Sequence, residues 1–490
     1  MTVHSPPPVM RTRVARALLI LTVAVAASPL EARAQSRVTL QQAVVEALAK
    51  NDRILDDSDV SAYAELDLRL ARSEFRPKVV PNVFGSFGQT DLASQHYGVD
   101  VTQRLTTGTE MRVSLGTATS QIPDPSGTGD VRFYNADTTL LLTQPLLRGF
   151  GTAVTRQALS SAELRQKDVE RQRQTLRRQV AIDATSAYYQ LVAQDAFLAV
   201  ARASVARGQA LHDAAEAKLA AGLVSQLDVL RARQLRADAE GQLADAVARR
   251  DEAQDVLLLV MGREPGEILV VDAEIPRVTG NVDVEVAVAT ALAARTELQS
   301  IVDAAADATM RLSVSRNRRL PQLDLNLAMT RRQTATSFRD SFGFDKFQLA
   351  TFFTVGMPVD RTAQNVDFQR ALLERARRDR ERVMLTRRIA AEVRREVRER
   401  DRLVRAVSTA ETSVDLSRQE VDVAQLRYDR GLSNNLDLVA AEGQLLAAEG
   451  RRIAALAQSA VQELRLKAAM GVLDPINDGA TALVMQGPPQ

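Results

Sequence analysis

The chain has 490 residues, and its 63 basic and 61 acidic residues leave a net charge of +2. It contains no Cys and only three His, which excludes disulfides, thiolate zinc sites, cysteine nucleophiles and a lipid on an N-terminal Cys, and argues against a histidine metal centre. The balanced charge argues against a nucleic-acid groove. An aromatic content of 4% favours long Ala- and Leu-rich helices over several ordinary globular cores.

Residues 1–34 have the pattern of a cleavable secretory signal peptide. Three arginines within residues 11–16 precede an apolar run, residues 17–27, that is too short to span a bilayer. An Ala-Arg-Ala cleavage motif follows, so we expect cleavage after Ala34 and export without lipidation. The alternative is an uncleaved anchor helix, against which the helix-breaking Pro29 argues.

The exported part is predicted to be a two-copy internal repeat. The pairs Gly222-Leu223 and Leu227-Asp228 recur 209 residues later as Gly431-Leu432 and Leu436-Asp437. The matches define a first repeat over residues 35–262, a linker or equatorial segment over 263–283, a second repeat over 284–472 and a C-terminal tail over 473–490.

Each repeat is predicted to contain one helix, one β segment and one long helical hairpin. Residues 153–219 lack Pro and carry small apolar residues at helical spacing, so they predict a helix about 100 Å long. So long a helix cannot be buried in a compact domain, which indicates coiled-coil packing against similar helices. The predicted ranges are helices 39–73 and 282–317, β segments 78–145 and 322–358, and hairpin tips near 222 and 431.

The β segments alternate apolar and polar residues with a period of two, and they hold nine of the thirteen Phe. Two interpretations stay open, a soluble half-buried sheet and an outer-membrane barrel with its apolar face toward lipid. A spanning sheet must close, and the smallest barrels need about eight strands. This chain offers four clear strands, or six if a hairpin around Gly108 counts. Three chains would therefore supply twelve strands, or eighteen.

The chain resembles the TolC-type outer membrane factors, which form the outer membrane efflux protein family. The resemblance rests on the start of the exported chain, on the strand-to-helix elbow and on the two hairpin tips. These motifs are Val38–Val44, Thr143–Gly149, Lys218–Leu230 and Arg427–Val439. The resemblance implies a mainly α fold with membrane β structure. It implies a homotrimer whose 12-stranded, or larger, β-barrel lies in the cell outer membrane and continues into a long α-helical coiled-coil tunnel across the periplasm.

Two features depart from the family pattern. The chain has no Cys for a lipid anchor, and its first β segment is longer than the usual two strands. The extra residues, 97–119, either lengthen the extracellular loops or add strands to the barrel.

No pattern in the sequence predicts an enzyme, a cofactor site or a metal site. The Gly149-Phe150-Gly151 stretch lacks the third glycine of a dinucleotide motif, and we interpret it as an elbow between barrel and tunnel. The prolines that bound the β segments are predicted elbows as well. They are Pro77, Pro145, Pro321 and Pro358.

The resemblance places the functional residues at the hairpin tips. It implies that the tips dock a periplasmic adaptor; a contact that seals each hairpin is the alternative for their leucines. The implied docking residues are Gly222, Leu223, Gly431 and Leu432. It also implies that Asp437 lines a periplasmic constriction, where three copies would form a carboxylate ring. Asp228 is the equivalent in the first repeat and is expected to help hold the tips shut. Helix capping is the alternative role for both Asp.

The expected function is a passive outer-membrane exit duct, gated by an iris-like opening of the periplasmic helix tips. The resemblance implies a tripartite efflux pump or a type I secretion system. The expected partners are two further copies, a periplasmic adaptor (membrane fusion) protein, an inner-membrane pump or ABC transporter, and outer-membrane lipid, with no nucleic acid. The alternatives are a coiled-coil stalk or adhesin, and the adaptor itself. The cargo stays open among drugs, metals, siderophores, polysaccharides and proteins.

Overall fold

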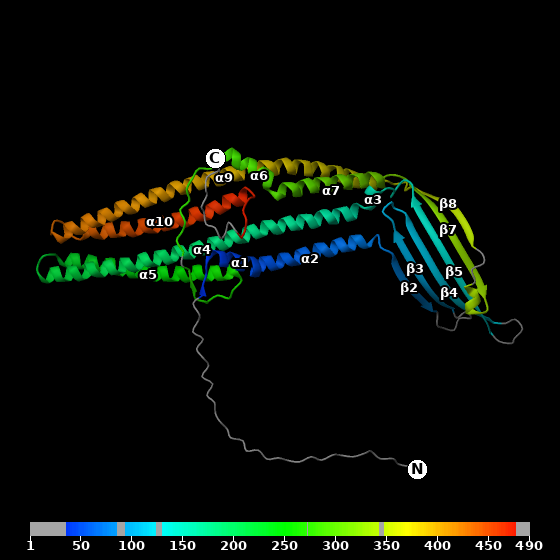
Figure 1. Cartoon of the computed structure of the whole chain (residues 1–490), viewed down its shortest axis with the longest axis horizontal. Coiled ribbons are helices and arrows are strands. Elements are labelled where there is room, and N and C mark those ends of the chain that lie inside the picture. The colour runs from blue at the N-terminus through cyan, green and yellow to red at the C-terminus, as the bar shows by residue number, and fades with distance from the viewer. Residues whose placement is uncertain (1–35, 86–93, 124–129, 272, 343–346, 477–490) are drawn as a thin grey trace, which may run out of the picture.

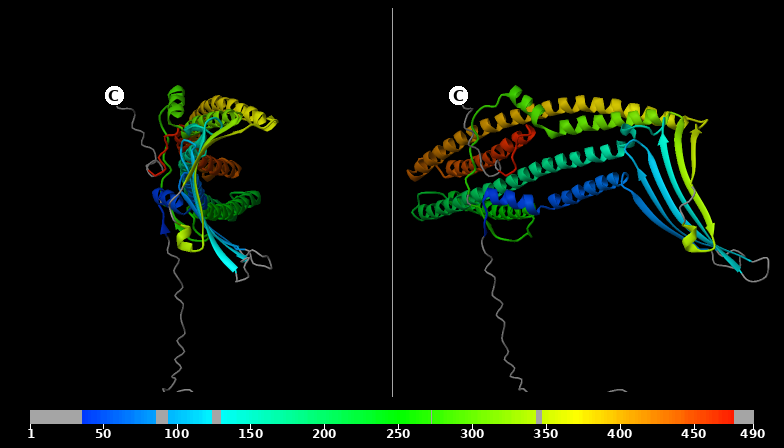
Figure 2. Two further views of the ribbon diagram at one scale, coloured as in Figure 1. Left: turned by 90° about the vertical axis from the view of Figure 1, so that its right-hand side faces the viewer. Right: turned by 45° about the vertical axis from the view of Figure 1, so that its right-hand side comes forward.

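The computed structural model describes residues 36–85, 94–123, 130–271, 273–342 and 347–476. The predicted signal peptide and residues 477–490 of the predicted tail lie outside the described residues. The molecule is elongated, with long helices over most of its length and a β-sheet at one end (Figure 1). The sheet bends away from the direction of the helices, and its strands lie side by side in one layer (Figure 2).

Two very long helices determine the length of the molecule. Helix α4 (Gln157–Ala220) has 64 residues and α9 (Thr362–Asp429) has 68, so each is about 100 Å long. Each folds back on a shorter partner, α5 (Gln226–Met261) or α10 (Leu436–Ala469), to form a hairpin. None of the described helices combines the length and the apolar character that crossing a membrane requires.

The two helices that precede the strands were predicted as continuous, and this was wrong. The first divides at Asn51 into α1 (Leu40–Lys50) and α2 (Asp52–Ser73), because Asn51 is extended and its side chain caps the second helix by accepting from Arg53 N. The second divides at the extended residue Arg295 into α6 (Val284–Ala294) and α7 (Thr296–Arg318). A short helix, α3 (Thr152–Thr155), likewise precedes α4.

The main sheet has six antiparallel strands in the order β2-β3-β4-β5-β7-β8 and is open at β2 and β8. The extra residues of the first β segment form two of these strands, so they do not merely lengthen loops. A short helix, α8 (Phe338–Ser341), lies between the last two strands. The strands are β2 (Lys78–Gly85), β3 (Ser94–Arg104), β4 (Glu110–Pro123), β5 (Asp130–Pro145), β7 (Gln322–Ala335) and β8 (Gln348–Gly356).

The two faces of this sheet differ in polarity, although Phe84, Leu141 and Phe352 lie on the more polar face and Arg331 on the more apolar one. Residues that pair directly across antiparallel strands share a face, so the register assigns each side chain to one face. One face carries Val79, Val99, Val101, Val113, Leu115, Leu140, Leu327, Met329, Leu349 and Phe353. The other carries Asn82, Asp100, Arg112, Asp137, Asn326 and Arg332.

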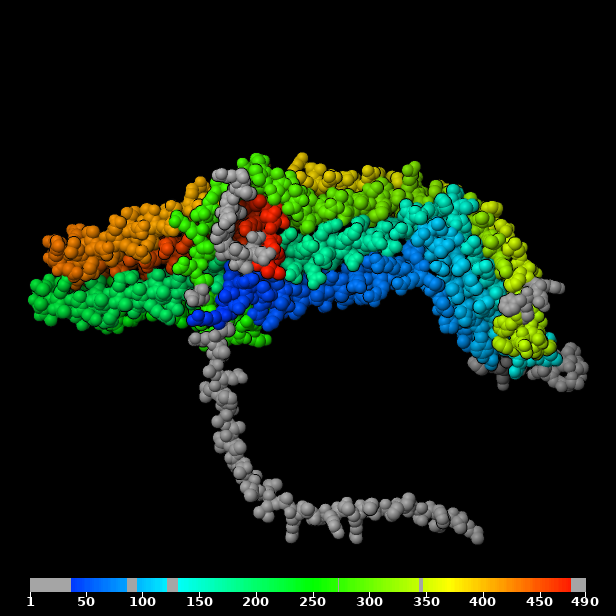
Figure 3. All heavy atoms as spheres, viewed as in Figure 1, coloured from blue at the N-terminus to red at the C-terminus, as the bar shows by residue number. Residues whose placement is uncertain are grey.

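A band of linker residues, 263–271 and 273–283, crosses the helices near their middle (Figure 3). There β1 (Ser36–Arg37) pairs in parallel with β6 (Leu269–Val270), next to the largest apolar cluster, which joins α1, α4 and α5. Arg400 of α9 is tied to the same band, because its guanidinium donates to the carbonyls of Thr279 and Gly280. It also pairs at 2.7 Å with Glu463 of α10, and both side chains are only 2% exposed.

Candidate functional site

The two hairpin tips have the same backbone geometry. At the first tip, Gly222 adopts φ 72°, Gly222 N donates to Leu219 O, and Leu223 N donates to Lys218 O. This is a Schellman ending, which requires a left-handed residue and therefore favours glycine. Gly431, with φ 69°, ends α9 through the equivalent bonds. The predicted turn glycines are thus placed at the turns.

The leucines that follow these glycines project into solvent. Leu223 is 74% exposed and Leu432 is 67% exposed. Neither side chain is buried against its own hairpin, which removes the support for the alternative that they seal it. Each is an apolar group on a projecting turn.

The two aspartates that follow the turns lie in different environments. Asp228 forms a capping box with Ser225 at the start of α5, where its carboxylate accepts from Ser225 N at 3.1 Å and from Ser225 Oγ at 2.7 Å. Asp437 lies exposed in the first turn of α10 and makes no hydrogen bond or ion pair within the described part of the chain. The equivalence suggested by the repeat therefore holds in sequence but not in environment.

The two tips are tied to each other by Lys218 of α4. Its ammonium lies 3.7 Å from the centre of the Tyr428 ring, a cation–π contact. It also donates to the Tyr428 carbonyl at 3.2 Å and to Asp429 Oδ1 at 3.4 Å. Tyr428 is almost fully buried at the end of α9, so this contact joins the last turns of both long helices.

Two further bonds join the hairpins. Asn435, which precedes α10, donates from Nδ2 to the carbonyl of Asp228 at 2.6 Å. Farther from the tips, Arg207 of α4 pairs at 2.6 Å with the nearly buried Glu442 of α10. We call the contacts made by Lys218, Tyr428 and Asn435 the tip latch.

Three buried polar atoms that have no hydrogen-bond partner among the described residues lie at the tip latch. They are Tyr428 Oη, Asp228 Oδ1 and Asn435 Oδ1. Burial raises the pKa of Tyr428, and the charges of Asp228 and Asp429 raise it further. Burial alone would raise the pKa of Asp228, but hydrogen bonds from Ser225 and Asn435 and the charge of Arg231 outweigh it and hold this pKa below the ordinary value. Unpartnered buried groups are costly, so burying these atoms lowers the stability of the contact between the tips.

The predicted proline elbows all lie where helices meet strands. Pro77 and Pro321 come directly before β2 and β7, Pro145 ends β5, and Pro358 lies between β8 and α9. The elbow after β5 is fixed by Asn317 of α7, whose side chain accepts from Gly149 N at 2.7 Å and donates to Leu147 O at 3.1 Å. The chain's course from sheet to helices is therefore set by specific hydrogen bonds.

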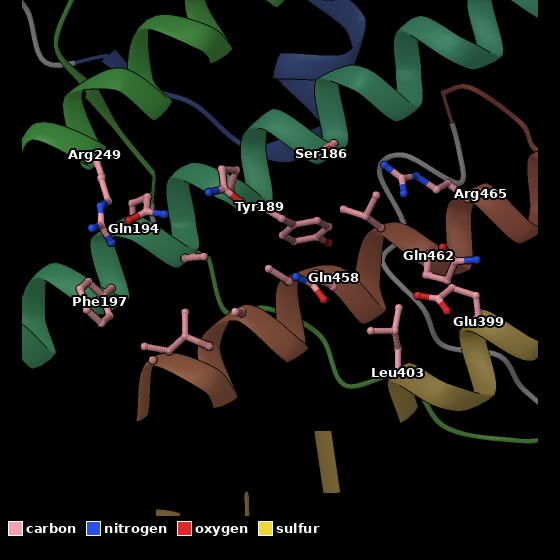
Figure 4. Close-up of a pocket in the computed structure, with 17 residues that line it drawn as sticks. Ser186, Tyr189, Gln194, Phe197, Arg249, Glu399, Leu403, Gln458, Gln462 and Arg465 are labelled. Carbon is pink, nitrogen blue, oxygen red and sulfur yellow. The ribbon is translucent and has the colours of Figure 1, made fainter. Parts of the chain in front are cut away.

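A cavity of about 520 Å³ lies between the hairpins, level with the band (Figure 4). Its walls come mainly from α4 and α10, with Arg249, Glu399 and several glutamines among the lining residues. Burial raises the pKa of the lining residue Tyr189 to about 12, and the adjacent Tyr188 adds to this effect. No group of metal-ligating side chains occurs among the described residues.

Sequence reasoning missed the residues of the tip latch. It treated the repeats as equivalent, whereas the contacts join positions at which the two tips differ: Lys218 aligns with Arg427, and Tyr428 aligns with Leu219. A signal was present in the sequence, because the two tips carry different side chains at matching positions. Such differences could have pointed to the residues of the tip latch.

Comparisons with known proteins agree with this architecture. Residues 63–263 match the model of the family described as "Outer membrane efflux protein". No curated protein matches the chain in sequence.

Several solved structures share the fold. The outer membrane protein VceC from Vibrio cholerae is 16% identical with a TM-score of 0.67, over 88% of this chain and 96% of that chain. The open MtrE channel of Neisseria gonorrhoeae is 16% identical with a TM-score of 0.66, over 88% and 89%. The CmeC channel of Campylobacter jejuni is 15% identical with a TM-score of 0.65, over 91% and 90%. Residues 63–263 thus match the outer membrane efflux protein family that the sequence resembles, and the chain as a whole shares the fold of these solved channel structures.

Proposed function

We propose that the protein is the outer-membrane exit duct of a tripartite efflux pump or a type I secretion system, and that three copies build it. The observation that carries the proposal is the open six-stranded sheet with one apolar face. The edge strands β2 and β8 leave unpaired backbone groups, and Val83 and Phe353 on them are largely exposed. In lipid such a sheet must close, and further copies of the chain can supply the missing strands.

The helices beside the sheet support closure by copies of the same chain. Successive contacts order them as α2, α4, α7 and α9, so α2 and α9 are the outermost. Helix α2 exposes an apolar stripe of Tyr63, Leu66 and Leu70, and its six acidic residues outnumber its three basic ones. Helix α9 exposes Leu373 and Met384, and residues 362–405 hold fourteen Arg against eight acidic residues. The two edges thus match in apolar character and are opposite in charge.

The proposed duct conducts passively and is gated at the tips. In the closed arrangement the tip latch holds the hairpins together, and breaking it lets the tips move apart like an iris. Three copies of the exposed Asp437 would then form a ring of carboxylates that favours cations. The exposed Leu223 and Leu432 would dock the periplasmic adaptor, which would couple the duct to an inner-membrane pump or ABC transporter.

Planar-bilayer recording tests the proposal. Protein extracted from outer membranes should insert as discrete channels with a small, cation-preferring conductance. A control preparation with charges placed on the apolar face, Val101→Asp together with Leu327→Asp, should give no insertions. Absence of channels from properly folded native protein would overturn the proposal.

A further inference from the structure

The extra hairpin β3–β4 gives each chain six strands where two ordinary hairpins would give four. We propose that the assembled barrel has eighteen strands and a lumen as wide as that of a porin, which matches the width of the helical tunnel. This inference rests on the trimer proposed above. The extracellular half then does not select cargo by size, and selection falls to the periplasmic tips.

The first support is that β3 and β4 are full wall strands. Pairing between them is unbroken from Ser94↔Ser120 to Arg104↔Glu110, and β4 continues to pair with β5 down to Glu110↔Thr143. They have 11 and 14 residues, and a tilted strand needs about 9–11 to span a bilayer. Both lie inside the sheet with hydrogen-bonded neighbours on each side.

The second support is that the two strands continue the polarity of the sheet. Val101 of β3 and Val113 of β4 pair on the apolar face. Asp100 lies on the opposite face, where it accepts from Asn82 of β2 at 2.6 Å. A solvated extracellular loop would have no reason to keep this alternation.

The third support is that the hairpin turn is built into the elbow on the tunnel side. Gly108 has φ 97°, and a Cβ there would lie 2.6 Å from the carbonyl oxygen of Gly149. Gly151 N donates to Thr107 O at 3.3 Å, and Thr109, nearly buried, donates to Gln144. The turn therefore lies at the level where strands meet helices. Because the hairpin adds two antiparallel strands, β5 runs in the same direction as it would without them.

The estimated perimeter of an eighteen-stranded barrel matches that of the tunnel. Strands about 4.8 Å apart and tilted by about 40° each occupy roughly 6.3 Å of perimeter, so eighteen span roughly 113 Å and twelve only about 75 Å. Four helices per chain line the tunnel wall next to the sheet, and twelve helices about 8–10 Å apart span roughly 96–120 Å. The eighteen-stranded barrel joins this tunnel without a change in width.

Because the chain has no Cys, single-cysteine labelling tests the proposal cleanly. Membrane-embedded protein carrying Asp100→Cys or Arg112→Cys should react with a charged, water-soluble maleimide. Val101→Cys and Val113→Cys should stay protected until the protein is denatured. Equal labelling of all four would show that the hairpin is a solvated loop and would overturn the proposal.

A matched pair on β7 separates this inference from the proposed function. Asn326→Cys should be labelled and Leu327→Cys protected. If this pair also fails to alternate, the membrane sheet itself is wrong and the proposed function fails. If it alternates while the β3 and β4 pairs do not, only the eighteen-stranded barrel fails. Imaging of the native protein in nanodiscs gives an independent count, with eighteen strands expected and twelve contradicting the inference.

Discussion

Asp228 and Asp437 occupy matching positions in the two repeats, but their carboxylates make different hydrogen bonds. Ser225, directly before α5, makes Asp228 half of a capping box, whereas α10 begins with a bond from Leu436 N to Asn434 Oδ1 and leaves Asp437 free for solvent. The sequence predicted the turns at both tips because glycine is the residue that the left-handed region favours. It could not predict the contacts of Lys218 with Tyr428, since these depend on how two distant hairpins lie side by side.

Replacing Lys218 tests the tip latch. Lys218→Met keeps the aliphatic stem but removes the ammonium from the Tyr428 ring and from Asp429, a loss of about 1–2 kcal/mol. We expect a roughly 5- to 30-fold increase in the open fraction in planar bilayers. Lys167→Met, an exposed position on the same helix, is the control and should leave gating unchanged. Equal gating in both variants would contradict the latch.

The lowered pKa of Asp228 predicts an acid response. The ionised carboxylate stabilises the closed tip, so its contribution is complete above the ordinary value of 3.8 and is lost as the pH falls through the lower pKa of the closed form. Conductance should therefore rise as the pH is lowered below about 4. Asp228→Asn should be leakier at neutral pH and should lack this rise. An acid response that survives in this variant must have another origin.

Asp437 should govern ion preference rather than closure. Asp437→Ala removes three carboxylates from the constriction at once, so the preference for cations, measured as the reversal potential in a salt gradient, should fall toward zero. Asp415→Ala, which removes an exposed carboxylate from α9 away from the tip, should keep the native reversal potential. An unchanged potential in Asp437→Ala would reject its place in the constriction.

At the scale of elements, the long helices and the alternating strands were predictable because each has its own periodicity. The break at Arg295 was not, since neither Gly nor Pro marks it and the residue is extended only in the folded chain. The break at Asn51 had a signal, an Asn able to cap the next helix, that the helical pattern around it hid. Whether residues 97–119 formed strands of the sheet was equally hidden, because the sequence does not show which neighbours these segments pair with.

Gly108 tests the elbow. Gly108→Ala places a Cβ against the Gly149 carbonyl in a backbone conformation that alanine resists, so it should destabilise the assembled barrel by about 1–3 kcal/mol. The readout is the temperature at which the detergent-solubilised oligomer dissociates. Gly241→Ala, in the open middle of α5 with no atom near the new methyl, should match or exceed the native temperature. Equal temperatures for both variants would show that the turn does not brace the elbow.

At the scale of the whole molecule, the sheet of one chain is open at β2 and β8. Strand counting predicts from the sequence that one chain cannot close a barrel alone, because the smallest spanning barrels have about eight strands. The opposite charges of α2 and α9 were not predicted, since only the fold reveals that these helices are the two outer edges. Arg400, paired with Glu463, fixes the second hairpin to the mid-length band, so we expect the proposed opening to move only the segment between the band and the tips.

The mass of the protein extracted from outer membranes in mild detergent tests the central claim most directly. Light scattering corrected for bound detergent should give three chains per particle, about three times the 53.5 kDa of the 490-residue chain less the predicted signal peptide. A stable, water-soluble particle of one chain, recovered without detergent, would contradict the account.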